Sequence, residues 1–165
     1  MDSCFNTFAD WAWARHHNEW SWYIRGFIII AFCGAAWRRH LPALVGLAIF
    51  FPVSAVIFPA PQTPKPYVVT FLETERTLLE SLSFPEMMLF LVTVIAFLWI
   101  LAAAFWHRSL FYGLLVANLG GAIKLGFGYW AWGDIGAIAL VPTLVTALVF
   151  NTAVLAWWMF QRRHH

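Results

Sequence analysis

The sequence predicts an all-α protein: a polytopic integral membrane bundle of five transmembrane helices with one short amphipathic surface helix. Its composition is 62% hydrophobic and only 11% charged, whereas soluble domains are about a quarter charged. Several apolar runs are close to the roughly 20 residues that a helix needs to cross a bilayer. Many tryptophans lie at the ends of these runs, where tryptophan anchors helices at the membrane surface. We therefore expect one membrane domain over residues 1–165.

Turn and charge signals set the boundaries of the spans. Arg38-Arg39-His40 ends the first span, and Pro52 predicts a kink in the second. Ser83-Phe-Pro-Glu86 is a capping box with proline in the first turn, which indicates a helix start. Trp132-Gly133-Asp134 forms a tight connection between the last two spans. The predicted spans are 20–37, 43–58, 85–106, 109–131 and 135–159.

The segment 59–84 joins the second and third spans. Prolines at 59, 61, 64 and 66 predict a stiff, extended loop. Thr70 and Glu73 form a capping-box pattern, which predicts a short helix over 71–82. We expect its apolar residues near one face and its charged residues, including Glu75, elsewhere, so that it lies on the membrane surface. Residues 1–19 are too polar to span and are expected to form an interfacial helix or an ordered tail.

The charges predict an orientation. Five spans put the turns 38–41 and 107–108 on the same side as the C-terminus, and that side carries five arginines and no acidic residue. All eight carboxylates fall on the other side or at its edge. The positive-inside rule then predicts a multi-pass protein of the cell inner (plasma) membrane, with the N-terminus outside and the C-terminus cytoplasmic.

Small residues at helical spacing predict close packing of the last two spans. Apolar helices in lipid associate through close backbone packing and hydrogen bonds, because hydrophobic burial gains nothing there. Asn118 and Asn151 lie at similar depth and are expected to hydrogen-bond across the helices. The packing residues are Gly113, Ala117 and Gly121 on one span and Ala139, Thr143 and Ala147 on the other.

Two cations inside the spans are the candidate binding residues. Arg25 lies about 7–8 Å and Lys124 about 10 Å from the outer ends of their helices, at 1.5 Å per residue. Glu86 and Asp134 begin two spans at the same face and are the expected counter-ions. One interpretation is that both cations snorkel outward and pair there. The other is a polar pocket, open to the outer leaflet, whose ligand-binding residues are Arg25, Glu86, Lys124, Asp134, Asn118 and Asn151.

The leading functional hypothesis is the binding, and in a further version the translocation, of a hydrophobic or anionic small molecule through that pocket. The first alternative is an accessory subunit of a larger membrane complex, and the second is a membrane-embedded enzyme. A monomer or homo-oligomer with a co-purifying ligand would support the binding hypothesis, and co-purifying subunits would support the accessory-subunit hypothesis. The net charge of +2 and the lack of a basic groove argue against a nucleic-acid partner.

The sequence contains no motif that assigns a catalytic residue or a cofactor. His16-His17-x-Glu19 holds metal-ligand residue types, but adjacent histidines point to different faces of a helix, so no metal site is predicted. Cys4 and Cys33 are too few for a disulfide framework, and Cys33 lies in an apolar span.

Overall fold

The fold is all-helical, as the sequence predicts. The structure is a computed structural model that describes residues 2–163, with side chains for residues 7–160, and it contains no strand within that range. The helices are α1 (Asp2–His16), α2 (Trp20–Trp37), α3 (Leu41–Val53), α4 (Pro66–Ser81), α5 (Phe84–Trp106), α6 (Leu110–Trp132), the 3₁₀ helix η1 (Gly133–Ala139) and α7 (Leu140–Arg163).

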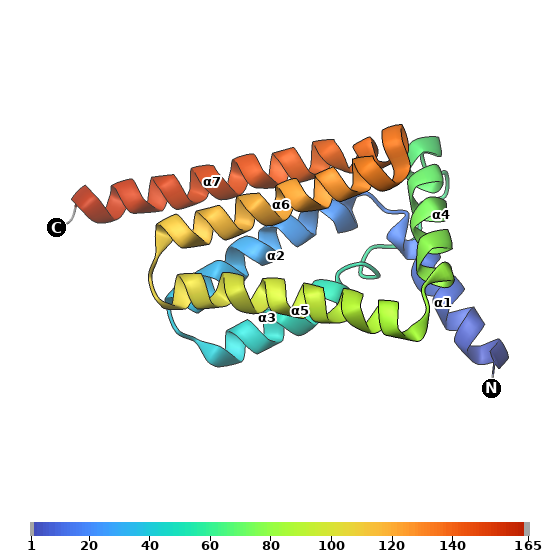
Figure 1. The fold of residues 1–165 in the computed structure, drawn as a ribbon, viewed down its shortest axis with the longest axis horizontal. Coiled ribbons are helices and arrows are strands. Elements are labelled where there is room, and N and C mark those ends of the chain that lie inside the picture. The colour runs from blue at the N-terminus through green and yellow to red at the C-terminus, as the bar shows by residue number, and fades with distance from the viewer. Residues whose placement is uncertain (1, 164–165) are drawn as a thin grey trace.

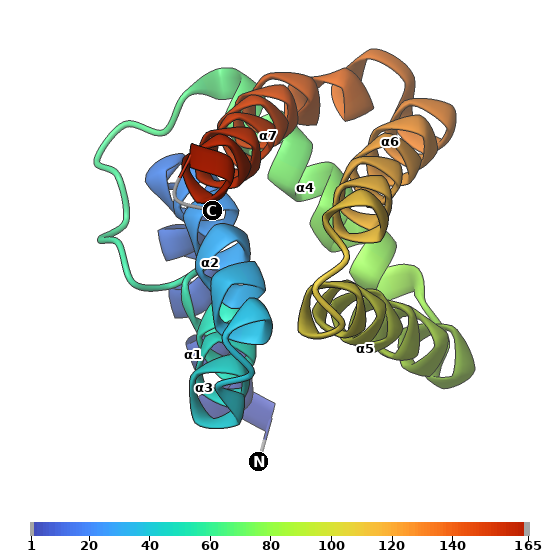
Figure 2. The same ribbon diagram turned by 90° about the vertical axis from the view of Figure 1, so that its left-hand side faces the viewer.

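Most of the helices, α3 included, run along the long axis, and α1 and α4 gather at one end of it (Figure 1). Helices α2, α5, α6 and α7 lie lengthwise, with α6 antiparallel to both α5 and α7. Helix α4 lies crosswise at the end where α6 turns into η1, and α1 is near it; the C-terminal end of α7 lies at the opposite end. Viewed down the axis, α5, α6 and α7 form an arc that faces α2 and α3 (Figure 2). We call the crosswise pair α1 and α4 the cap.

The buried core joins α2 to α5 and α7. Ala36 and Leu101 are fully buried, and the rings of Phe105 and Phe150 meet edge to face with centroids 6.1 Å apart. Most other large apolar side chains of α5, α6 and α7 face outward; Trp99, Phe111 and Leu148 are each about 70% exposed. Such an apolar exterior is typical of a protein that contacts lipid or another chain.

Two helical stretches of the described chain are long and apolar enough to cross a membrane, Phe84–Trp106 and Leu110–Phe160. The second has 51 residues and contains α6, η1 and α7. It is much longer than one crossing, which takes roughly 20 residues, and it folds back on itself at η1 (Figure 1). Helix α3 is a shorter apolar helix. These stretches support a membrane location, and the five crossings remain a prediction.

Several boundaries differ from the predicted ones. Helix α3 ends at Val53 rather than at 58; Pro52 lies inside its last turn, and just after it the Ser54 hydroxyl donates to the Phe51 carbonyl at 2.6 Å, a local bond that competes with continuation of the helix. Helix α4 begins at Pro66, before the expected start at 71, with proline in the first turn where it costs no hydrogen bond. The predicted span 135–159 begins as η1 and becomes α-helical only at Leu140.

The small residues of α6 are divided between two neighbours. A β-carbon added to Gly113 would lie 2.5 Å from the Phe105 ring, so this glycine faces α5 rather than α7. Gly121 faces α7, with Thr143 Cγ2 at 3.7 Å. The predicted stripe is therefore correct at Gly121 and Thr143, whereas Gly113 instead lets α5 approach α6.

Gly128 and Gly136 bring η1 into contact with the backbone of α6. A β-carbon on Gly136 would lie 2.0 Å from the Gly128 carbonyl oxygen, which leaves no room for any side chain. The turn between them uses Gly133 at φ 56°, a conformation that favours glycine. This contact fixes the return of the chain from α6 into α7.

Replacing Gly136 with alanine is expected to destabilise the protein, because the added methyl group meets backbone atoms that cannot move aside. The expected loss is about 1–3 kcal/mol, the usual cost of overpacking, measured as a lower midpoint in a thermal melt in detergent. Gly126→Ala is the matched control, because nothing lies within 4 Å of a β-carbon there, and it should leave the midpoint unchanged or raise it. Equal midpoints for both variants would contradict the close contact.

Candidate functional site

Helix α4 covers the end of the bundle through one apolar face. Val68 and Leu72 are fully buried. The Phe71 ring packs between Trp22 of α2, with centroids 5.4 Å apart, and Trp132 of α6, at 6.1 Å. Glu75 lies seven residues after Val68 and therefore shares its face at helical spacing. This differs from the expectation that Glu75 lies away from the apolar face, and it directs a carboxylate into the bundle.

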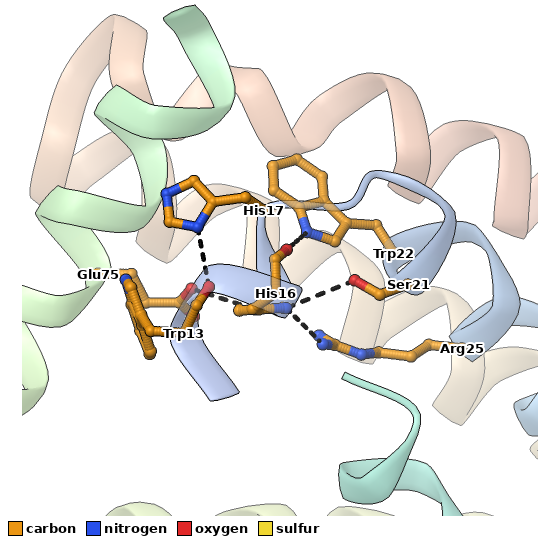
Figure 3. Close-up of polar contacts among 7 residues, drawn as sticks. All are labelled: Trp13, His16, His17, Ser21, Trp22, Arg25 and Glu75. Carbon is orange, nitrogen blue, oxygen red and sulfur yellow. Dashed lines mark hydrogen bonds and ion pairs between the residues drawn. The ribbon is translucent and has the colours of Figure 1, made fainter. Parts of the chain in front are cut away.

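His16, the last residue of α1, connects this carboxylate to Arg25 (Figure 3). Its Nδ1 lies 3.1 Å from Arg25 Nη2 and 3.4 Å from Ser21 Oγ, and its Nε2 lies 3.9 Å from Glu75 Oε2. The junction is held by Trp22, whose indole N–H donates to the His16 carbonyl at 3.3 Å. Side chains from α1, α2 and α4 thus meet at one point.

The hydrogen bonds define the charge and the tautomer of His16. A guanidinium only donates, so His16 Nδ1 accepts from Arg25 and the remaining proton lies on Nε2, toward Glu75. Burial, together with the nearby positive charges of Arg25, His17 and Lys124, lowers the pKa of His16 to about 3. His16 is therefore a neutral ring at neutral pH, and it adds no charge to the cluster.

Lys124 of α6 supplies a second cation to the same cluster. Burial raises the pKa of Glu75, while the positive charges of Lys124 and then Arg25 oppose that rise. The side chain of Lys124 is exposed, and no hydrogen bond or ion pair within 4 Å of its ammonium exists among the described residues. The cluster of His16, Arg25, Glu75 and Lys124 thus holds two cations and one carboxylate.

Arg25 and Lys124 both influence the pKa of Glu75, whereas the sequence analysis expects Glu86 and Asp134 as their counter-ions. The Glu86 carboxylate accepts from the Ser83 backbone N–H at 2.8 Å, which completes the predicted capping box at the start of α5. Neither Glu86 nor Asp134 pairs with either cation in the part of the chain that the structure describes. Glu75 forms no ion pair within 4 Å with either cation among the described residues, but its pKa responds to both of their charges. The spacing of Val68, Leu72 and Glu75 is the sequence signal that could have identified this carboxylate.

Asn118 and Asn151 hydrogen-bond across α6 and α7, as the sequence predicts. Each amide donates to the other, at 3.0 and 2.9 Å, and each also donates to a carbonyl of its own helix, from Leu114 and Ala147 respectively. With every amide hydrogen used in this way, the pair holds the two helices together.

No metal-binding group is present at this site or elsewhere in residues 7–160: no three His, Cys, Asp or Glu side chains there are arranged to hold an ion. His17, next to His16, bonds the Trp13 carbonyl through Nδ1 at 2.8 Å instead. Comparison of the chain with protein-family models, with curated proteins and with solved structures finds no match.

The buried neutral His16 is expected to make the protein acid-sensitive. Because its folded-state pKa lies below its ordinary value, its contribution to stability is complete above about pH 6.5 and is lost as the pH falls toward 3. Between pH 6.5 and 5 this amounts to about 2 kcal/mol, at about 1.4 kcal/mol per unit. Thermal melts across this range should show a steeper decline for the wild type than for His16→Asn.

The difference between these two profiles isolates His16, because Glu75, with its raised pKa, acts in the opposite sense in both proteins. His107→Asn, at the other end of the bundle, controls for the loss of a histidine. Parallel profiles for wild type and His16→Asn would mean that His16 is not held neutral.

Proposed function

We propose that this chain is a multi-pass inner-membrane protein that binds an anionic, amphipathic small molecule at the cluster of Arg25, Glu75 and Lys124. The observation that carries the proposal is the unmatched positive charge: two cations meet one carboxylate, and the Lys124 ammonium has no bonded partner among the described groups. A charge within a membrane helix costs about 3 kcal/mol or more unless it finds a partner or a polar cavity. A ligand anion would supply that partner.

The chemistry of the cluster favours a carboxylate, phosphate or sulfate group. The planar guanidinium of Arg25 has donors left for two oxygens of such a group, and the Lys124 ammonium adds a mobile charge. The aromatic side chains of Trp22, Phe71 and Trp132 lie beside the cluster and would contact the apolar part of the ligand. Translocation through the bundle has less support, because Asn118 and Asn151 bond each other.

The proposed topology has five crossings, by α2, α3, α5, α6 and α7, with the cap outside the cell. It is supported by the arginine-rich turns, since Arg39 donates to the Trp106 carbonyl at 3.2 Å and so joins the 38–40 turn to the end of α5. Helix α3 is only about 20 Å long at 1.5 Å per residue, so a crossing there requires local thinning of the bilayer or a contribution from residues 54–58.

The accessory-subunit hypothesis keeps one specific observation in its favour. Trp99 lies in the middle of α5 and is 71% exposed, whereas tryptophans in membrane helices favour the two membrane surfaces. Ile95 is exposed beside it, at 66%. A mid-depth aromatic surface of this kind suits contact with another membrane helix. No specific observation favours the enzyme hypothesis.

Cysteine labelling tests the topology. In a background without Cys4 and Cys33, Thr63→Cys lies in the loop before α4 and His107→Cys in the turn after α5, and both positions are exposed. A membrane-impermeant maleimide should label residue 63 in intact cells and residue 107 only after permeabilisation. The reverse pattern, or equal labelling of both, would rule out an external cap.

Lys124→Met tests the binding site, because it keeps the stem and removes the charge. Native mass spectrometry of the purified protein should show that the occupancy of the co-purifying anionic ligand falls about tenfold or more relative to the wild type. This decrease corresponds to the loss of one charge-assisted hydrogen bond of about 1.5–3 kcal/mol. Lys124→Arg should retain the ligand, and a thermal melt confirms that each variant is folded. A stable Lys124→Met variant with wild-type ligand occupancy would remove Lys124 from the site.

Matched carboxylate variants test which acid shares the site. Glu75→Gln should raise the occupancy of an anionic ligand, because it removes the competing negative charge. Glu86→Gln and Asp134→Asn should leave the occupancy unchanged, since neither residue pairs with the cations. Loss of ligand in Glu75→Gln would show that the ligand is not an anion.

A further inference from the structure

A pocket lies at the capped end of the molecule; it shares Trp22 with the surroundings of the Lys124 cluster but none of its charged residues. Its volume is about 280 Å³, and it lies where the beginnings of α2, α4 and α7 meet η1. One wall is aromatic and carries a carboxylate, and the other is aliphatic. The lining residues are Glu19, Trp22, Tyr23, Tyr67, Ala137, Ile138, Val141 and Pro142.

An ammonium group of the chain itself already lies against the carboxylate of this pocket. Lys65 Nζ lies 2.7 Å from Glu19 Oε2, 3.4 Å from the Tyr67 hydroxyl and 5.7 Å from the centre of the Tyr67 ring. The Tyr67 hydroxyl donates to the other oxygen of Glu19 and so orients that carboxylate. Lys65 thus shows which chemistry the polar end of the pocket accepts: a cation held by a carboxylate and an aromatic face.

We propose that this pocket binds the ammonium group of an amphipathic amine, which takes the place of the Lys65 ammonium. The ligand cation would pair with Glu19 and lie over Tyr67, with Trp22 and Tyr23 as further aromatic contacts. Its apolar chain would lie along Ile138 and Val141. The amine is either the headgroup of a lipid such as phosphatidylethanolamine or a free alkylamine, because both present the same cation on an apolar chain.

The exchange is feasible because Lys65 is a weakly held competitor. The Lys65 side chain is 60% exposed, so it can move fully into water. The Glu19 side chain is 27% exposed, and the ligand ammonium would keep this carboxylate paired after the lysine has left. The charge of the pocket is unchanged, since one ammonium replaces another. Exposed ion pairs of this kind contribute little to stability. Burial of the ligand's apolar chain against the aliphatic wall therefore favours the amphipathic amine over Lys65.

The test is a calorimetric titration of the full chain, in neutral detergent, with hexylammonium chloride, corrected by titration of empty micelles. The dissociation constant should rise about tenfold or more in Glu19→Gln, which loses the charge-assisted contact. It should fall about two- to fivefold in Lys65→Met, which loses the competitor. Hexanol should bind much more weakly than hexylammonium. Glu80→Gln, an exposed acid paired with Arg76 outside the pocket, is the matched control.

Several results would overturn the proposal, and the two remaining variants distinguish it from the anion site. Wild-type affinity in Glu19→Gln, weaker binding in Lys65→Met, or hexanol binding as tight as hexylammonium would each refute it. Lys124→Met should not change the hexylammonium affinity, so the failure of either site is seen separately.

Native mass spectrometry of the protein released from nanodiscs identifies the source of the amine. If the ligand is a lipid, phosphatidylethanolamine should be retained and phosphatidylglycerol should not. Binding of hexylammonium without lipid retention identifies a free amine.

Discussion

The inward-facing carboxylate of Glu75 is the interaction on which the capped end of this protein depends. Arg25 and Lys124 belong to helices far apart in the sequence, and both bring positive charge to the same place. Without a negative group between them, their mutual repulsion would oppose the packing of α2 near α6. Glu75 is directed toward them because it shares the face of α4 on which Val68 and Leu72 are buried, and its Oε2 lies 3.9 Å from His16 Nε2. The apolar face that docks α4 therefore also carries the negative charge of the cluster.

The two ends of the bundle are stabilised differently. Toward the end with the arginine-rich turns, packing is aromatic and aliphatic, with Phe105 against Phe150 and the rings of Trp37 and Trp157 4.6 Å apart. At the capped end, apolar packing of α4 is joined by polar contacts, which include Arg15 bound to the carbonyls of Val56 and Phe58. Both proposed binding sites lie at this end, among those polar groups.

The periodicity and punctuation of the sequence predict most of the helices, because apolar runs, prolines and capping boxes act locally. The bounds of α2 match the predicted 20–37, and the Ser83–Glu86 capping box forms as expected. The effect of Pro52 is harder to predict, because a proline kinks a helix only when the residues after it remain helical. Ser54 instead closes the turn.

The partners in the candidate site were less predictable, for a physical reason. Depth along a helix follows from residue counts, which is why Arg25 and Lys124 were expected at one level. Rotation about a helix axis and the placement of a cap follow from tertiary contacts, here Phe71 against Trp22 and Trp132. Glu86 and Asp134 have suitable depth, but Glu86 bonds Ser83 in the capping box, and neither carboxylate pairs with Arg25 or Lys124 among the described residues.

The order of the elements along the chain has a consequence for biogenesis. Helix α4 is synthesised before α6, yet the ring of Trp132, against which Phe71 packs, belongs to the end of α6. Because a chain emerges from the ribosome N-terminus first, α4 has no complete docking surface until α6 has been synthesised. Glu75 therefore takes its final place near Lys124 only after α6 is present. Docking of the cap follows the folding of α6 onto the bundle.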